Sequence, residues 1–409
     1  MSDAPTLYHR MASAKATPGQ HDPAACPARV DIAIVGAGVI GLSIGWRLAS
    51  RGLQVALFDA GEPGCGTSAA ATGMLAAAAE HEAGGDTLLA LGLESQRLWP
   101  SFRAGLEAAS GCDIDYRAEG TLVLAVGRDE VDRLRARHDL HRRAGLATSW
   151  MPGSAARESE PGLRPAVSAA ISCPDDHQVD PPRLLGALQH AFLVAGGSLL
   201  SHQRVDALDR VAGGIGGVVA GDRVCRADVT ILATGAAIGG GGLLPAEIRL
   251  PIRPLKGQAL ALRMRRGSLP IEHVVWTSEI HLAPKSDGRL VVGATVEEAG
   301  FDPAITAGAI YALLEAGRRV LPGLEEMVID SLWTGFRPTS DDDAPVIGNT
   351  QLGGLLVAGG HHRNGYLLAP VTAQAIEQLV LDGAIAGEAR RFGVDRFRAA
   401  GRPAFGDAA

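Results

Sequence analysis

The sequence predicts an α/β fold of two interleaved domains, one built around a parallel sheet and the other around an antiparallel sheet. Three observations lead to this prediction. The chain has 409 residues, which is more than one hydrophobic core usually serves. An apolar strand, a glycine-rich turn and a helix follow one another near the start, in the order of a βαβ unit. A set of short strands begins much later, near Ile252.

The first βαβ unit has two predicted strands, Val30–Val35 and Gln54–Phe58. Both are apolar and rich in β-branched or aromatic residues, and the second ends at Asp59. Between them, the segment after Gly41 has the apolar spacing of a helix. Because a strand, a helix and a strand in this order form a right-handed crossover, a parallel sheet is expected.

Periodicity defines the remaining elements. Helical spacing predicts helices at Leu88–Ala109, Glu130–Ala144, Asp180–Ala195 and Ile305–Val320. Short apolar runs predict strands at Thr121–Val126, Val218–Val219, Asp228–Leu232, Gln258–Met264, His273–Trp276, Ile280–Ala283, Arg289–Val292 and Gly354–Ala358. The loop Lys285–Gly288 joins two of these strands as a hairpin. Residues Gly66–Ala79 carry almost only small side chains, which lets their backbone approach another group closely.

Composition excludes several classes of function. The formal net charge is −7, so nucleic acid and anionic membranes are not expected partners. No apolar run is long enough to cross a membrane. The five cysteines form no CxxC pair, so neither a metal site nor a disulfide framework is expected. Unpaired thiols and the absence of a secretory leader in residues 1–30 predict a cytoplasmic protein with a flexible N-terminal tail.

The motif Gly36-Ala37-Gly38-Val39-Ile40-Gly41 indicates dinucleotide binding. It is a GxGxxG that lies between a strand and a helix, and Asp59 follows at the end of the next strand. Gly36 allows the tight turn, Gly38 lets pyrophosphate reach the backbone, and Gly41 packs the helix on the sheet. The helix N-terminus would bind the phosphates, and Asp59 would accept hydrogen bonds from the ribose.

A second segment favours FAD over NAD. Val229–Leu232 is an apolar strand that leads into Ala233-Thr234-Gly235. This arrangement resembles the second dinucleotide contact of flavoproteins with two dinucleotide-binding motifs. A core strand ending in a turn would have the same pattern. Together with the first motif, it predicts FAD as the cofactor.

Three segments resemble the D-amino-acid oxidase superfamily, and within it the glycine oxidases of thiamine biosynthesis. They are the GxGxxG motif, Gly66–Leu75 and Gly359–Pro370. Supporting segments are His177–Pro181, Gly293–Glu297 and Gly335–Pro338, and the similarity runs from about residue 31 to 385. The resemblance implies a two-dinucleotide-type, Rossmann-like FAD-binding domain (31–110, 170–250 and 330–385). It also implies an antiparallel-sheet substrate domain (111–169 and 251–329), with a C-terminal tail at 386–409.

The resemblance also assigns binding residues to the cofactor. The flavin is expected between Thr67–Met74 and His361–Leu367, because small residues there let backbone amides reach its carbonyl oxygens. The residues expected to bind FAD are Gly36, Gly38, Val39, Ile40, Gly41, Asp59, Ala60, Thr67, Ser68, Thr72, Gly73, Met74, Val205, Thr234, Gly235, His361, His362, Arg363, Asn364, Gly365, Tyr366 and Leu367. No cysteine follows Cys225, so the C-terminal covalent attachment of some relatives is excluded and non-covalent FAD is expected.

For the substrate, the resemblance points to Arg337, Arg363, His281 and Met74. Arg337 matches the arginine that pairs with the substrate carboxylate, for which a planar guanidinium is well suited. No catalytic acid or base is assigned, because an amino acid with a neutral amine passes hydride to the flavin when it is correctly positioned. His281 stands where relatives commonly have tyrosine. It either replaces the tyrosine hydrogen bond, changes the preferred substrate, or lies at a strand edge facing solvent.

The predicted activity is therefore the oxidation of glycine by O2 to glyoxylate, ammonia and hydrogen peroxide, with the imine serving the thiamine thiazole. The alternatives are an oxidase or dehydrogenase of sarcosine, proline or D-amino acids, with O2 or a quinone as acceptor. A flavoprotein that has lost its redox activity is a further alternative. The relatives are often homotetramers, so a homo-oligomer is expected.

Overall fold

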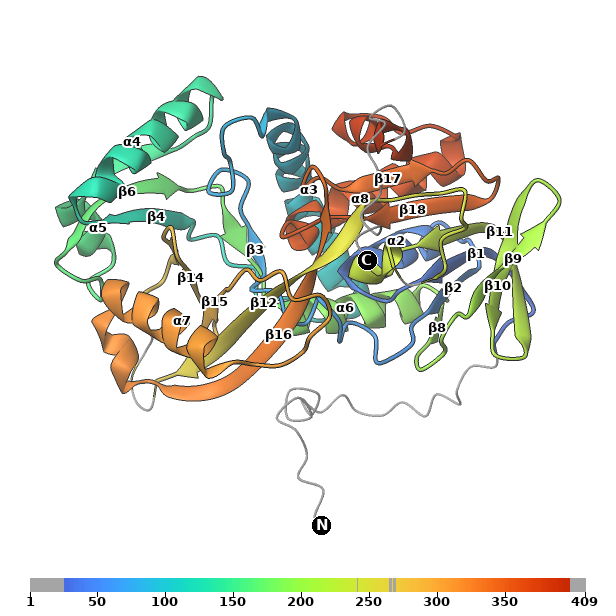
Figure 1. Ribbon diagram of the computed structural model, residues 1–409, viewed down its shortest axis with the longest axis horizontal. Helices are drawn as coiled ribbons and strands as arrows, with labels where there is room; N and C mark the ends of the chain where they lie inside the picture. Colours follow the sequence, from blue (N-terminus) through green and yellow to red (C-terminus); the bar gives the residue numbers. More distant parts are fainter. Residues whose placement is uncertain (1–25, 241, 265–266, 268–269, 398–409) are drawn as a thin grey trace, which may run out of the picture.

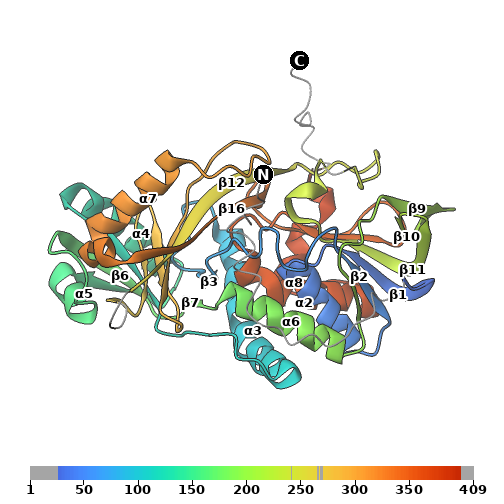
Figure 2. The same ribbon diagram turned by 90° about the horizontal axis from the view of Figure 1, so that it is seen from below.

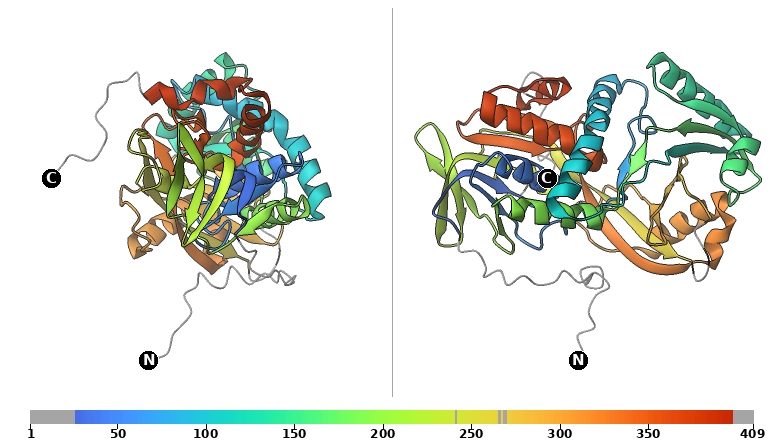
Figure 3. Two further views of the ribbon diagram at one scale, coloured as in Figure 1. Left: turned by 90° about the vertical axis from the view of Figure 1, so that its right-hand side faces the viewer. Right: turned by 180° about the vertical axis from the view of Figure 1, so that it is seen from behind.

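The computed structural model describes residues 26–397, except 241, 265–266 and 268–269. The fold has two parts, each with its own large sheet, and two long strands run from one part toward the other (Figure 1). Seen from behind, helix α3 (Asp86–Ser110) stands between the two parts (Figure 3). None of the described helices is both long and apolar enough to cross a membrane.

The first sheet is mainly parallel. Its strands, in spatial order, are β17 (Val346–Asn349), β18 (Leu355–Gly359), β11 (Arg223–Leu232), β1 (Arg29–Val35), β2 (Val55–Phe58) and β8 (Ser198–Leu200), with β10 (Gly214–Ala220) and β9 (Ala207–Val211) added antiparallel beside β11. β1 pairs in parallel with both β2 and β11. The predicted parallel sheet is therefore present, with β1 at its centre.

Alternate side chains of β1 enter two different cores. Ile32 and Ile34 pack with α2 (Val39–Ala49), α6 (Pro181–Val194) and α8 (Gly365–Asp382). Ala33 and Val35 pack on the other face, toward β10. A strand buried on both faces must be apolar throughout, which explains why Val30–Val35 lacks an alternating pattern. Figure 2 shows α2, α6 and α8 together beneath this sheet.

The second sheet is mainly antiparallel. Its strands, in order, are β16 (Val328–Ser340), β12 (Ile252–Arg263), β15 (Arg289–Gly293), β14 (His281–Pro284), β13 (Val274–Trp276), β4 (Thr121–Val126), β6 (Val167–Cys173) and β5 (Ser149–Pro152). Its helices are α4 (Arg128–Arg143), α5 (Gly153–Ser159) and α7 (Ala307–Val320). A small ribbon of β3 (Met74–Leu75) and β7 (His177–Gln178) is separate from both sheets. The hairpin predicted at Lys285–Gly288 joins β14 and β15.

The strand pairing differs from the predicted domain division at two places. β16 lies in the second sheet because it pairs with β12 along nearly its whole length, although 330–340 was predicted in the FAD-binding domain. β6 also lies in the second sheet, between β4 and β5. With these two strands moved, the division into two interleaved domains remains our proposal.

The predicted C-terminal tail is wrong for residues 388–397. They form two short 3₁₀ helices, η3 (Glu388–Phe392) and η4 (Val394–Phe397). Phe392 and Val394 are buried in the two cores, and Arg396 pairs with Asp342. These contacts order a segment whose sequence shows no helical period. At the other end, residues 29 and 30 of the predicted N-terminal tail belong to β1, residues 26–28 precede that strand, and residues 1–25 lie outside the described residues.

Candidate active site

A cavity of about 720 Å³ lies between the two parts of the fold. It begins at the turn after β1 and reaches the inner ends of β12, β14 and β16. The cavity is also lined by a loop of small residues, 66–74, which we call the small-residue loop, and by the turn between β18 and α8. Its volume is within the range of ligand pockets, and segments from the whole chain meet in it.

The glycine motif forms one end of the cavity. Gly36 has φ +106°, and a Cβ there would lie 2.5 Å from the carbonyl oxygen of Ala233, so a side chain is excluded. Gly38 lines the cavity immediately before α2, in extended conformation and without a side-chain cap. The unfilled space and the helix N-terminus suit a phosphate group. Gly41 instead packs on Gly36, where a Cβ would be 1.9 Å from the carbonyl oxygen, and it does not line the cavity.

Asp59 is fixed at the end of β2. Its two carboxylate oxygens accept hydrogen bonds from the backbone amides of Ala37 (2.8 Å) and Gly61 (2.9 Å). The carboxylate therefore lies across the glycine turn and lines the cavity. Val205 lines the same end, as do Thr234 and Gly235 after β11. This is the arrangement that ribose recognition requires.

The small-residue loop connects the two parts of the fold. The Thr67 hydroxyl donates to the carbonyl of Phe336 on β16 (2.6 Å), and the Ser68 hydroxyl accepts from the amide of Val39 (2.9 Å). The Tyr366 hydroxyl donates to the carbonyl of Ser68 (2.8 Å). These bonds hold the loop along the cavity between the glycine motif and the second sheet.

Gly73 in this loop has φ +82°, and a Cβ would lie 2.1 Å from the carbonyl oxygen of Val179. Only glycine fits this position. Beside it, Lys285 is fully buried, and its ammonium donates to the carbonyls of Thr72 (2.8 Å) and Val179 (2.8 Å) and to the side chain of Gln178 (3.0 Å). Burial lowers the pKa of Lys285 to about 7. The sequence placed Lys285 in a hairpin turn and gave no signal of this bridging contact.

The turn after β18 carries two neutral histidines. Burial lowers the pKa of both His361 and His362 to about 3. A ring nitrogen of His361 lies 2.9 Å from the Thr372 hydroxyl, and one of His362 lies 2.9 Å from the Thr339 hydroxyl. Asn364 and Gly365 then begin α8 with its N-terminus at the cavity. Leu367 faces α3, because its carbonyl accepts from the Ser95 hydroxyl, and it does not line the cavity.

Arg337 projects from β16 into the far end of the cavity. Its Nη1 donates to the carbonyls of Thr295 (3.1 Å) and Lys256 (3.3 Å). The guanidinium lies on Gly257 of β12, where a Cβ would be 2.5 Å from Nη1. No other hydrogen bond of its nitrogens is found within the described part of the chain, so Nε and Nη2 are left for an anionic ligand. This half-buried site suits a bidentate carboxylate.

His281 lies on β14, between β13 and β15, and lines the cavity. The alternative of a solvent-facing histidine at a strand edge is therefore wrong. Its Nε2 is buried without a hydrogen-bond partner, and the residue opposite, Gly293, leaves room for the ring. Burial, with Arg337 nearby, lowers the pKa of His281 to about 3, so the ring is neutral. Trp276 packs beside it, with ring centroids 5.6 Å apart, and Met74 lines the same end.

Arg363 lies at the entrance of the same region and forms an ion pair with Glu80. Glu80 follows β3 and was not predicted as a site residue. The sequence offers only a single acidic residue after four alanines, and nothing in that pattern indicates that it faces a cavity.

All but two of the predicted site residues line this cavity. Those that do are Gly36, Gly38, Val39, Ile40, Asp59, Ala60, Thr67, Ser68, Thr72, Gly73, Met74, Val205, Thr234, Gly235, His281, Arg337, His361, His362, Arg363, Asn364, Gly365 and Tyr366, and those that do not are Gly41 and Leu367. Among the described residues, no group of three or more His, Cys, Asp or Glu side chains is placed to hold a metal ion.

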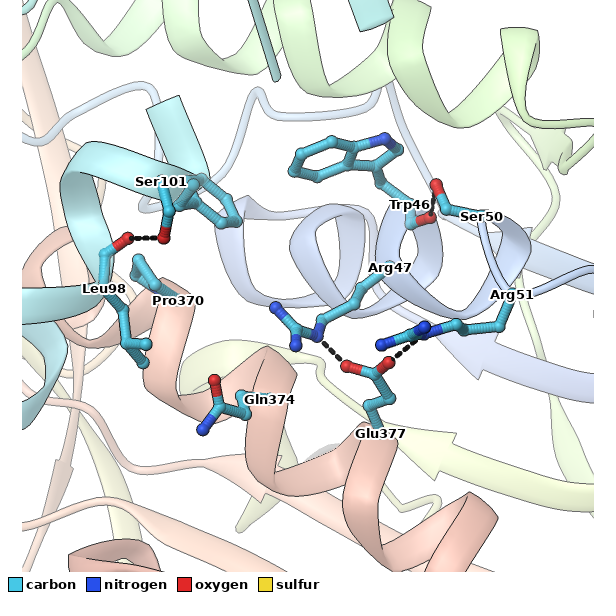
Figure 4. Close-up of a pocket in the computed structure, with 10 residues that line it drawn as sticks. Trp46, Arg47, Ser50, Arg51, Leu98, Ser101, Pro370, Gln374 and Glu377 are labelled. Carbon is cyan, nitrogen blue, oxygen red and sulfur yellow. Dashed lines mark hydrogen bonds and ion pairs between the residues drawn. The ribbon is translucent and has the colours of Figure 1, made fainter. Parts of the chain in front are cut away.

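A second cavity, of about 400 Å³, lies between α2, α3 and α8 and shares no lining residue with the first. Figure 4 shows Glu377 of α8 directed at Arg47 and Arg51, and it forms ion pairs with both. Trp46 forms part of its wall. The carboxylate of Glu377 already satisfies the two cations, so this cavity offers no comparable set of ligand-binding groups.

Comparison with known proteins supports the geometry. Residues 31–379 match the family described as FAD dependent oxidoreductase. The chain is 34% identical over 362 residues to the glycine oxidase of Geobacillus kaustophilus, covering 86% of this chain and 93% of that protein. The crystal structure of glycine oxidase from Geobacillus kaustophilus superimposes with a TM-score of 0.84 at 33% identity, covering 90% and 99% of the two chains.

A further relative is a bifunctional protein. The bifunctional protein ThiO/ThiG of Trichormus variabilis is 33% identical over 354 residues, covering 86% of this chain. The matched part is 53% of the relative, so the chain spans about half of that protein's length.

Proposed function

The chain belongs to the family of FAD-dependent oxidoreductases, and from this premise we propose that it is an amino-acid oxidase with glycine as its substrate. The reaction converts glycine, O2 and water to glyoxylate, ammonia and hydrogen peroxide. Identity to glycine oxidases extends over most of the chain. The observation that carries the proposal is the guanidinium of Arg337, which lies at the far end of a dinucleotide-sized cavity with two nitrogens unoccupied.

The residues present fit FAD. At Gly36 and Gly73 an added Cβ would collide with backbone, so the cradle along the cavity depends on glycine. We propose that the N-terminus of α2 holds the pyrophosphate, Asp59 the ribose, and the small-residue loop with the His361–Tyr366 turn the flavin. When bound, FAD supplies the oxidant that accepts hydride from the substrate α-carbon and passes the electrons to O2.

The protein's own contribution is to position the substrate and exclude water. Arg337 binds the carboxylate with its two unoccupied nitrogens and so fixes the α-carbon. His281 stays neutral at physiological pH and lines the substrate end of the cavity, with its Nε2 buried against Gly293. Met74 and Trp276 provide apolar walls there, which keep water from the reacting carbon.

His281 also bears on which amine is preferred. Its ring stands where relatives commonly have tyrosine. The shape of the substrate site and the hydrogen-bonding group beside it therefore differ from those of such relatives. An oxidase or dehydrogenase of sarcosine or of a D-amino acid is therefore the second candidate. Val296 and Phe301 line the same cavity and are largely exposed, so a ligand with an additional apolar group would find contacts there.

The enzyme's setting is part of the same proposal. We place it in the cytoplasm, because the spacing of its cysteines predicts no disulfide framework. We expect its imine product to serve the thiamine thiazole, as the resemblance to thiamine-pathway glycine oxidases implies. O2 and a small amino acid are its reaction partners. The resemblance also predicts that the protein forms a homo-oligomer, and this remains a prediction.

A substrate panel tests the activity. Glycine is expected to give hydrogen peroxide with the highest kcat/KM, ahead of sarcosine, D-alanine and D-proline, because the ligand end is closed by His281, Trp276 and Met74. The measurement is peroxide formation in air, together with anaerobic bleaching of the flavin. The variant His281→Tyr serves as the matched comparison for specificity. Bleaching without peroxide would identify a dehydrogenase, and no bleaching by any amine would refute the proposal.

The attachment of FAD is tested separately. We expect acid precipitation to release all yellow colour into the supernatant. The cofactor contacts available along the cavity are hydrogen bonds and packing, and Cys65, the cysteine that lines it, is near the glycine-motif end. The supernatant absorbance and the mass of the precipitated protein are the measurements. Flavin that remains with the pellet, with a matching increase in protein mass, would contradict non-covalent binding.

A further inference from the structure

Glu80 is a buried carboxylate in the substrate end of the cavity. Its side chain is 12% exposed, and it lines the cavity together with Arg337, Arg363 and His281. Its Oε2 pairs with Nε of Arg363. Within the described residues, no hydrogen-bond donor is found for Oε1. One oxygen is therefore held by a cation, and the other is left for a ligand.

The backbone that carries Glu80 is fixed by a second buried acid. Asp176 accepts hydrogen bonds from the amides of Ala77 (3.0 Å), Ala78 (3.0 Å) and Ala79 (2.7 Å). Gln96 also donates to it, at 2.9 Å. Because three consecutive amides bind one carboxylate, the backbone just before Glu80 is fixed. The position of Glu80 at the cavity therefore follows from these hydrogen bonds.

Several charged groups face Glu80. Arg363 is its ion-pair partner, and Arg337 is close enough to feel its field: burial and Arg363 lower the pKa of Arg337, and Glu80 opposes this. Glu82, two residues further along the same loop, and Asp176, which lies between β6 and β7, add negative potential. Burial is the largest influence and, against the opposing effect of Arg363, raises the pKa of Glu80 to about 7. His281 is neutral, so the ligand end holds two guanidinium groups and one carboxylate near its titration point.

This set of charges suits both ends of an amino acid. The substrate carboxylate pairs with Arg337, and the ammonium needs an acceptor a few ångströms away. We propose that Glu80 accepts the proton that the substrate ammonium must lose before hydride transfer. This inference rests on the proposed amine-oxidase function and adds a catalytic base, where the sequence assigned none.

The step is a simple proton transfer. An N–H bond of the ammonium breaks, an O–H bond forms at Oε1 of Glu80, and the nitrogen keeps the electron pair. That pair becomes the C=N bond of the imine as the α-hydrogen leaves with its two electrons to FAD. Glu80 later returns its proton to solvent. A general base is most effective when its pKa is near the working pH, as burial arranges here.

The test is anaerobic flavin reduction by glycine as a function of pH, in the FAD-loaded enzyme and in Glu80→Gln. In the wild type, the reduction rate is expected to reach its plateau just above neutral pH. In Glu80→Gln we expect it to fall by about 10²-fold or more near neutral pH. The rate should then rise about tenfold per pH unit toward the pKa of free glycine, because only substrate that arrives deprotonated reacts.

Three comparisons separate this role from a structural one. Glu82→Gln removes an exposed carboxylate that does not line the cavity but raises the pKa of Glu80, so it should keep the plateau rate and move the rise of the rate only slightly toward lower pH. Glycolate, which has the carboxylate but no amine, should perturb the flavin spectrum of Glu80→Gln with a Kd within about twofold of the wild type. The shorter acid in Glu80→Asp should lower the plateau rate but keep the neutral-pH limb.

Specific outcomes would overturn the inference. An unchanged pH profile in Glu80→Gln, or parallel loss of glycolate binding, would mean that Glu80 only positions Arg363. If Glu80→Gln does not bind FAD, Glu80→Asp provides the test. The proposal would be refuted if glycine reduced the flavin of Glu80→Asp only at alkaline pH. Failure of glycine to reduce the wild-type flavin at any pH would instead refute the proposed function itself, and the inference with it.

Discussion

Replacing Arg337 by alanine is expected to raise KM for glycine by about 10²–10³-fold while leaving the absorbance spectrum of bound FAD intact. Two charge-assisted hydrogen bonds from a half-buried guanidinium contribute about 3–4 kcal/mol together, and each 1.4 kcal/mol is tenfold in affinity. The side chain projects from β16 beyond the flavin-side loop, so its loss empties the carboxylate site and spares the cofactor contacts. Steady-state kinetics of the FAD-loaded variant measure the effect.

Two further variants sharpen this result. Arg337→Lys keeps the charge but not the planar pair of donors, and should recover only part of the affinity. Gly257→Ala leaves Arg337 in place but puts a Cβ where its guanidinium lies, 2.5 Å from Nη1. It should raise KM in the same direction without removing any charge. Loss of FAD from Arg337→Ala, with the protein still folded, would show that Arg337 belongs to the cofactor site instead.

Local sequence was sufficient to predict the dinucleotide end of the site. A GxGxxG with a strand before it, a helix after it and Asp59 at the next strand end all lie within one βαβ unit. The local conformation of the turn and the helix is enough to position these residues. The strand that ends before Thr234 was also recognised, because its last residues, Val229–Leu232, form a mainly apolar run of which Thr230–Leu232 are buried.

The substrate end could not be predicted in the same way, because long-range pairing assembles it. Glu80 reaches the cavity through amides bound by Asp176, nearly a hundred residues away in the sequence. His281 is central only because β13 and β15 flank its strand. β16 was placed in the wrong part of the fold because its pairing with β12 has no local signature. In each case the deciding partner is distant, and periodicity alone carries no information about it.

Lys285 is a second residue whose contacts are distant in the sequence. Lys285→Met is expected to lower the free energy of unfolding by about 3 kcal/mol or more. Methionine fills similar space but leaves three buried acceptors without a donor, each costing about 1–3 kcal/mol. These acceptors are the carbonyl of Thr72 in the flavin-side loop, the side chain of Gln178 in β7 and the carbonyl of Val179. The substitution should therefore weaken the contact between the two parts of the fold. Denaturant unfolding at saturating FAD is the measurement, since bound ligand otherwise shifts apparent stability.

The pH dependence of the free energy of unfolding provides a second, independent test of the role of Lys285. Folding lowers the pKa of Lys285 from 10.5 to about 7, so between these values the unfolded chain binds more protons than the folded protein. Stability contributed by this group must then rise with pH across that window. The wild type should gain stability relative to Lys285→Met as the pH is raised. Ser286→Ala, at an exposed position of the same hairpin, removes only the hydrogen bond from its hydroxyl to Asp115, so it should cost about 1 kcal/mol without the change with pH. A difference between wild type and Lys285→Met that shrinks with rising pH would mean that the buried amine stays protonated in the folded enzyme.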